Sequence, residues 1–87
     1  MDKSGRSGSA EMILGAIGSV ILGGGKPANA RLVAAAIRDT REVWASYFLP
    51  QDRVRMIELL AGLPNRVPDE TTRIDLAAFT AALQAVN

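Results

Sequence analysis

Apolar residues recur with helical spacing in four successive segments of the chain. In residues 10–22 the spacing i, i+3, i+4, i+7, i+8 places five side chains on one helix face: Ile13, Ala16, Ile17, Val20 and Ile21. Ser9 is the expected N-cap of this helix. Gly23-Gly24-Gly25 is expected to end it, because glycine adopts the left-handed capping conformation without steric cost.

The central part of the sequence predicts two more helices. The first begins near Pro27 or Asn29 and runs to Tyr47 or Phe48, and one face carries Val33, Ile37, Thr40, Trp44 and Tyr47. Leu49-Pro50 breaks the pattern, because the residue before a proline is pushed out of the helical region. The next helix starts at Pro50 and is expected to stop at Gly62, with an inward stripe of Met56, Leu59, Leu60 and Leu63.

A fourth helix is predicted at the C-terminal end, after an ordered loop that contains two prolines. Thr72-Arg73-Ile74-Asp75 matches a helix-capping pattern. The apolar stripe that follows consists of Leu76, Phe79, Leu83 and Val86. No segment alternates with the period of a strand, so we predict an all-α, four-helix bundle-like single domain over residues 10–87. Residues 1–9 have no apolar side chain after Met1, and we expect a disordered tail there.

Composition limits the chemistry that this chain can perform. Its 87 residues suffice for one domain, and they include no histidine and no cysteine. The commonest general base, the thiolate nucleophile and the usual soft metal ligands are therefore missing from the sequence, so we expect neither an enzyme nor a bound cofactor. The lack of cysteine fits a reducing compartment, and we expect a cytoplasmic protein.

The uncharged run over residues 12–25 has two interpretations. Its fourteen residues are too few to span a bilayer, which takes about twenty, so we expect no membrane partner. A secretory signal is one interpretation, since Lys3 and Arg6 precede the run and Ala28-Asn29-Ala30 resembles a cleavage site. We favour a buried amphipathic helix, because Glu11 abuts the run and glycines separate it from that site.

Small residues lie four positions apart in the first predicted helix, at Gly15, Ser19 and Gly23. This spacing lets two helix backbones approach closely. The partner helix is either in the same chain or in a second copy, for which we expect dimer contacts at Gly15, Ile17, Ser19 and Ile21. Gly23-Gly24-Gly25-Lys26 does not match a phosphate-binding loop, because the motif's earlier glycine and its hydroxyl residue are replaced by Val20 and Pro27.

The arginines near the Leu49-Pro50 break also have two interpretations. Helix, break and helix could form a helix-turn-helix in which Arg53 and Arg55 contact nucleic acid. Acidic residues are interleaved with these arginines, however, and the net charge is only +1. A solvated face with weak ion pairs is the interpretation that we favour.

The aromatic cluster of Trp44, Tyr47 and Phe48 is the candidate partner-binding site. Core packing accounts for Trp44 and Tyr47, which share the helix face of Val33 and Ile37. Tyr47, Phe48 and Leu49 together cover more than one side of a helix end, which is typical of a protein-binding surface. We therefore predict that Trp44, Tyr47, Phe48 and Leu49 bind another protein.

A further set of features follows in order along residues 10–60: Leu14-Gly15, Val20-Ile21-Leu22 before Gly23, Asn29, Leu32-Val33 and Ile37, and an amphipathic helix after Leu49. In these features the chain resembles the YmgB/AriR family of small bacterial two-component connector proteins, which are linked to biofilm and acid-stress control. The resemblance implies a helical dimer that regulates by binding other proteins, such as a sensor kinase, and DNA binding has also been proposed for the family. Pro27, the three glycines, Trp44 and residues 63–87 depart from the family pattern.

These observations lead to one main hypothesis and two alternatives. The main hypothesis is a small cytoplasmic regulator that acts by protein binding, as a connector or antiactivator of a sensor kinase or transcription factor, and that forms a homodimer. The first alternative is a DNA-binding regulator of the helix-turn-helix type, and the second is a membrane-surface or exported peptide led by residues 12–22.

Overall fold

The polypeptide is built mainly from α-helices in the part of the chain that the structure describes. The computed structural model describes residues 2–24 and 26–86, with the side chains of 8–24 and 26–86, so Met1, Gly25 and Asn87 lie outside the described residues. No strand occurs among the residues described, and the predicted all-α class is confirmed. The elements are α1 (Asp2–Ala16), the π-helical turn η1 (Ile17–Ile21), α2 (Pro27–Asp39), α3 (Arg41–Tyr47), α4 (Pro50–Ala61) and α5 (Glu70–Ala85).

Helix α1 extends further toward the N-terminus than its apolar stripe predicts. It begins at Asp2, so residues 2–9 are helical where the composition indicates a disordered tail. Ser9 therefore lies inside the helix and is not its N-cap. Ala10 and Ile13 are buried and anchor the helix, and extending an existing helix is far easier than nucleating a new one.

The first helix ends ahead of the glycines, as predicted. Its last turn is a π-helix in which the Leu22 amide donates to the Ile17 carbonyl oxygen at 3.0 Å. Gly24 has a φ of +79°, a conformation that is costly for residues with a Cβ atom. A Cβ atom on Gly23 would collide with the Ser19 carbonyl group. These two glycines allow the chain to turn from η1 into α2.

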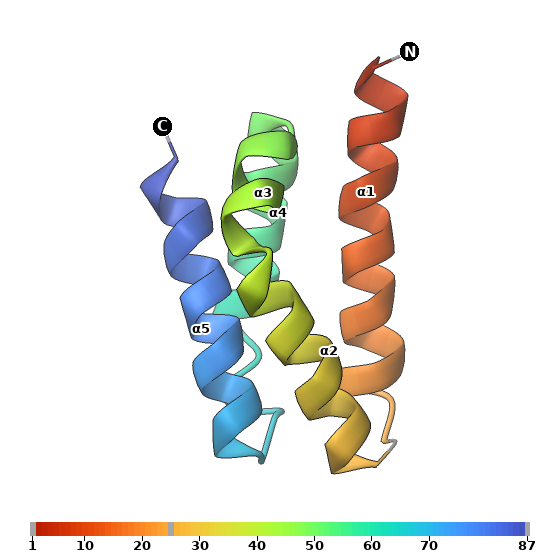
Figure 1. Cartoon of the computed structure of the whole chain (residues 1–87), viewed down its shortest axis with the longest axis vertical. Coiled ribbons are helices and arrows are strands. Elements are labelled where there is room, and N and C mark those ends of the chain that lie inside the picture. Colours follow the sequence, from red (N-terminus) through yellow and green to blue (C-terminus); the bar gives the residue numbers. More distant parts are fainter. Residues whose placement is uncertain (1, 25, 87) are drawn as a thin grey trace.

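The predicted helix over residues 27–47 is two helices, α2 and α3, separated at Thr40. Thr40 has φ −108° and ψ 15°, outside the α-helical range. Its hydroxyl donates to the Ala36 carbonyl oxygen at 2.7 Å, and such a bond from a threonine to its own helix disturbs the backbone ladder. The break turns α3 away from the line of α2 (Figure 1).

The last two helices begin in different ways, α4 with a proline in its first turn and α5 with a side-chain cap. Helix α4 begins at Pro50, as predicted, with Leu49 extended before it. Helix α5 begins earlier than expected: its N-cap is Asp69, whose side chain accepts from the Thr72 amide at 2.9 Å. The predicted cap at Thr72 is therefore wrong, because a carboxylate three residues earlier already satisfies the first free amides.

Helix α5 is the common support of the fold. Helices α2, α3 and α4 each contact it, and α4 also contacts α1. In Figure 1, α5 and α1 form the two flanks, and the α2–α3 segment crosses between them. The most deeply buried large side chains are Ile17, Phe48, Met56, Thr72, Phe79 and Leu83. The radius of gyration is 12.2 Å, as expected for a compact domain of this length, for which it is about 12 Å.

The described helices also bear on the apolar run of residues 12–25. No helix in the described part of the chain is both long enough and apolar enough to cross a membrane. Ile13 and Ile17 are buried in the core.

Candidate functional site

Four aromatic rings form a continuous series from the core to the surface at α3. Phe79 of α5 meets Phe48 edge-on, with ring centroids 6.5 Å apart, and Phe48 stacks on Trp44 at 5.9 Å. Trp44 meets Tyr47 edge-on at 6.3 Å. Phe79 and Phe48 are fully buried, whereas Tyr47 is 42% exposed. The series therefore ends in a rigidly supported aromatic surface.

Local backbone geometry positions these rings. Trp44 donates its indole N–H to the Thr40 hydroxyl at 2.8 Å, which orients the ring. The Phe48 amide donates to the Trp44 carbonyl oxygen at 2.9 Å, and Phe48 then leaves the helix with an extended backbone. This change of direction turns the Phe48 ring toward α5 while Tyr47 stays on the outside.

The predicted partner-binding residues divide into two groups. Trp44 is half-buried and Tyr47 is exposed, so both present surface to solvent. Phe48 and Leu49 are buried, and their side chains belong to the core. Val43, which the sequence pattern did not single out, is 63% exposed one turn before Tyr47. The spacing of Val43 and Tyr47, i and i+4, is the signal that could have identified it. We name Val43, Trp44 and Tyr47 the α3 surface.

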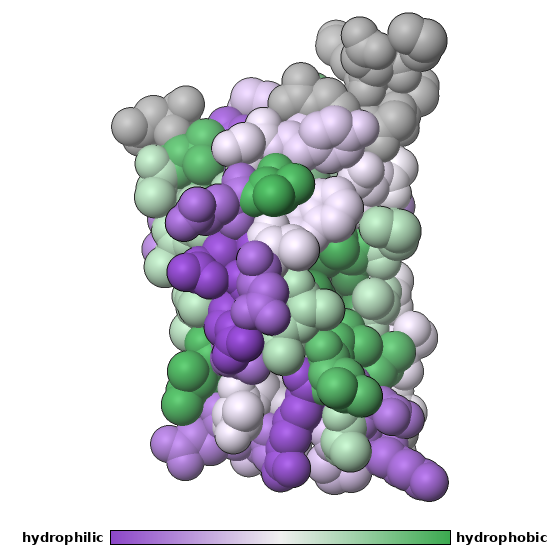
Figure 2. Space-filling view, in the orientation of Figure 1, coloured by the Kyte–Doolittle hydropathy of each residue, from purple (hydrophilic) through white to green (hydrophobic). Residues whose placement is uncertain are grey.

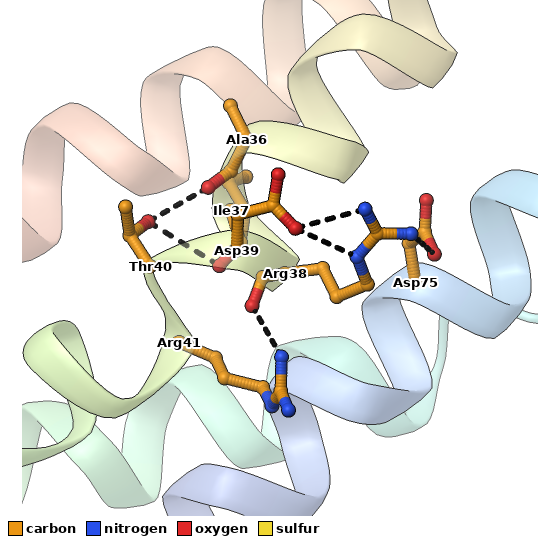
Figure 3. Close-up of polar contacts among 7 residues, drawn as sticks. All are labelled: Ala36, Ile37, Arg38, Asp39, Thr40, Arg41 and Asp75. Carbon is orange, nitrogen blue, oxygen red and sulfur yellow. Dashed lines mark hydrogen bonds and ion pairs between the residues drawn. The ribbon is translucent and has the colours of Figure 1, made fainter.

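A polar cluster borders α3 at the break between α2 and α3 (Figure 3). Arg38 donates from Nη1 to Asp75 Oδ1 of α5 at 2.9 Å, and from Nε and Nη2 to Asp39 Oδ1 at 3.1 and 2.8 Å. Hydrogen bonds to Asp39 and Asp75 raise the pKa of Arg38 above its usual value. Arg41 Nη1 donates to the Arg38 carbonyl oxygen at 2.8 Å.

This cluster joins the two parts of the broken helix to α5. Figure 2 shows hydrophilic side chains in a band over the seam between α5 and the α2–α3 segment, with apolar patches on either side. The polar cluster consists of ion pairs between side chains and hydrogen bonds to backbone carbonyl oxygens. We therefore interpret the cluster as the support that positions α3.

The two arginines predicted to contact nucleic acid are engaged with protein groups. Arg53 donates from Nη1 to the Phe48 carbonyl oxygen at 2.9 Å, and so caps the C-terminal end of α3. Arg55 pairs with Glu11 Oε2 at 3.3 Å and with Asp52 Oδ1 at 3.7 Å. The recorded bonds of Arg53 use Nη1 alone, so they orient the guanidinium group toward the end of α3.

The predicted dimer contacts also divide into an inner and an outer pair. Ile17 is fully buried and Ile21 packs against the core from a half-buried position. Gly15 and Ser19 are exposed, and the Ser19 hydroxyl donates to the Gly15 carbonyl oxygen at 2.8 Å. Close packing inside the chain therefore involves the isoleucines, and the small residues face outward.

Among the residues described, no cluster of three or more carboxylate, histidine or cysteine side chains has the geometry to hold a metal ion.

No family model, curated protein or solved structure matches the chain. The resemblance to the YmgB/AriR family stays a prediction.

Proposed function

We propose that this chain is a small regulatory protein that acts by binding another protein through the α3 surface. The observation that carries the proposal is the exposure of two large side chains, Val43 and Tyr47, one turn apart at the outer end of the aromatic series. Aromatic residues backed by a packed core are typical of the sites that dominate protein–protein affinity.

The support beneath the α3 surface strengthens this proposal. Trp44 is held by the Thr40 hydroxyl and by stacking on Phe48, so its ring has little freedom to lose on binding. A surface that is already ordered binds more tightly than one that must become ordered. Isolated exposed apolar residues elsewhere, such as Ile74, have no comparable aromatic support among the described contacts.

The finer parts of the proposal rest on the sequence. The resemblance to the YmgB/AriR family makes a sensor kinase or a transcription factor the class of partner that we propose, with a connector or antiactivator role such as biofilm control. The lack of cysteine supports a cytoplasmic location. A homodimer paired through Gly15 and Ser19 belongs to the same proposal, because both residues face outward.

A photo-crosslinking amino acid placed at position 43 tests the proposal in cells of the native host. The matched control carries it at position 74, where Ile74 is 59% exposed and Val43 is 63% exposed. We expect a protein to be crosslinked from position 43 and not from position 74. The captured protein is then purified, and its affinity for the wild type and for Val43→Lys is measured.

The affinity measurement decides between the outcomes. Val43→Lys is expected to weaken binding at least about ten-fold, because it inserts a charge into a desolvated contact. Ile74→Lys introduces the same charge elsewhere and is expected to leave the affinity unchanged. Equal losses in the two variants, or no crosslink from position 43, would contradict the proposal.

A further inference from the structure

A pocket lies away from the α3 surface, between the C-terminal end of α4, the loop that follows it and α5. Its volume is about 240 Å³. Apolar side chains from all three segments line it: Leu60, Leu63, Val67 and Leu76. These four residues are buried members of the core, so the pocket is an opening into the apolar interior.

Arg73 is the one charged residue among those that line the pocket. Its Nη1 atom donates to the Val67 and Pro68 carbonyl oxygens at 2.7 and 2.8 Å. These two bonds hold the guanidinium group against the loop. For the other edge of the group, formed by Nε and Nη2, the structure records no acceptor among the described residues.

Two other arginines in this molecule show what that edge binds. Arg31 donates from Nε and Nη2 to Asp69 Oδ1 at 3.0 and 2.7 Å. Arg38 uses the same two atoms on Asp39 Oδ1. The planar guanidinium group suits carboxylates. In Arg31 and Arg38, therefore, the Nε and Nη2 atoms bind a carboxylate. The same two atoms of Arg73 belong to a side chain that lines an apolar pocket.

We propose that this pocket binds a small organic carboxylate with an apolar tail. The carboxylate pairs with the Nε and Nη2 atoms of Arg73, and the tail lies against Leu60, Leu63 and Leu76. The volume is sufficient, because an apolar protein cavity of about 150 Å³ holds benzene and this pocket measures about 240 Å³. A largely apolar cavity with one charged group is typical of small-molecule sites. This proposal is independent of protein binding at the α3 surface.

Octanoate is the probe for the test, and octanol has the same tail without the charge. Each is titrated into the full-length protein labelled with nitrogen-15 while amide shifts are recorded by NMR. We expect saturable shifts with octanoate at residues around the pocket. Octanol is expected to bind at least about five-fold more weakly, because it lacks the ion pair. Equal affinities, or no saturable shift with octanoate, would overturn the proposal.

Three variants separate the contributions of head and tail. Arg73→Gln removes the guanidinium group and its charge but keeps a polar side chain, and it is expected to abolish the preference for octanoate over octanol. Ala77→Leu extends a side chain into the pocket and is expected to abolish binding of both ligands. Ala85→Leu is the matched control, because Ala85 is also an exposed residue of α5 but does not line this pocket. Octanoate binding retained by Ala77→Leu, or lost in Ala85→Leu, would show that the ligand lies elsewhere.

Discussion

At the scale of single residues, buried polar side chains determine how the helices pack against one another. Asp75 is 4% exposed, and its carboxylate accepts from Arg38 Nη1 at 2.9 Å. In the described part of the chain, no buried side-chain nitrogen or oxygen atom lacks a hydrogen-bond partner. Because an unpaired buried carboxylate is strongly destabilising, the Arg38–Asp75 pair specifies how α2 docks on α5.

Removing both partners of this pair is predicted to cost less free energy of unfolding than the sum of removing each partner alone. Asp75→Ala is expected to lower the free energy of unfolding by about 1–3 kcal/mol, because the buried hydrogen bond is lost. Arg38→Met should lower it further, since it leaves the Asp75 carboxylate buried without a cation. The double variant should be more stable than the sum of the two losses predicts. Urea unfolding followed by circular dichroism measures all three.

Asp39→Ala is the control for this cycle. The Asp39 side chain is 65% exposed, and losing an exposed ion pair changes stability by less than about 1 kcal/mol. Strict additivity of Arg38→Met and Asp75→Ala would show that the pair does not couple α2 to α5.

The carboxylate at the start of α5 predicts how stability depends on pH. Hydrogen bonds from Arg31, and then from the Thr72 amide and hydroxyl, hold the pKa of Asp69 well below its usual value. Because the folded state has the lower pKa, the stabilisation is complete above the unfolded pKa of about 4 and is lost as pH falls below it. We expect the urea midpoint to decrease below pH 4, and to decrease less in Asp69→Asn.

Arg31→Gln provides the complementary measurement. It removes the largest cause of the lowered pKa and leaves the Thr72 bonds in place. An intermediate dependence on pH is therefore expected, and a dependence as steep as in the wild type would contradict the assignment to Arg31.

At the scale of elements, a helix end is predictable from the sequence where the residues at that end determine it. Proline at the start of α4 and the glycines after η1 determine those ends through their own backbone geometry. The break at Thr40 was not predicted, because the apolar face continues through it and the hydroxyl bond to Ala36 appears only in the folded helix. Helix propensity alone did not reveal that α1 begins at Asp2.

The candidate site was predictable only in part, for the same reason. The aromatic cluster is visible in the sequence, but which of its rings point inward depends on α5, since Phe48 packs on Phe79. Arg38 and Asp75 are 37 residues apart. No local pattern pairs residues at that distance, and so the support of α3 emerges only from the packing of α2 on α5.

Replacement by alanine is predicted to change stability in opposite directions at Gly15 in α1 and at Gly24 after η1. Gly15→Ala should raise the free energy of unfolding by about 0.5–1 kcal/mol, because alanine favours helix and the new Cβ atom meets no atom within 4 Å. Gly24→Ala should lower it by about 1 kcal/mol, because φ is +79°. Both variants lower the conformational entropy of the unfolded chain by a similar amount. Each therefore serves as the control for the other in urea unfolding.

The apolar surface that remains exposed is a property of the whole molecule. A chain of this length buries only about 60–65% of the surface of its unfolded state. Large apolar side chains are exposed on several helices, with Leu32 70%, Met12 58% and Val54 54% exposed. Pairing with a second copy or with another protein would cover part of this surface and stabilise the fold by mass action.

The proposed homodimer makes the last prediction. A leucine at position 15 would hold two helix backbones apart, so Gly15→Leu should raise the dimer dissociation constant at least about ten-fold. Ala36→Leu, which places the same side chain at an exposed position of α2, should leave it unchanged. Sedimentation velocity over a range of concentrations measures both. A wild type that stays monomeric at the highest concentration, or an equal effect of Ala36→Leu, would refute pairing through Gly15 and Ser19, while protein binding at the α3 surface would still stand on its own test.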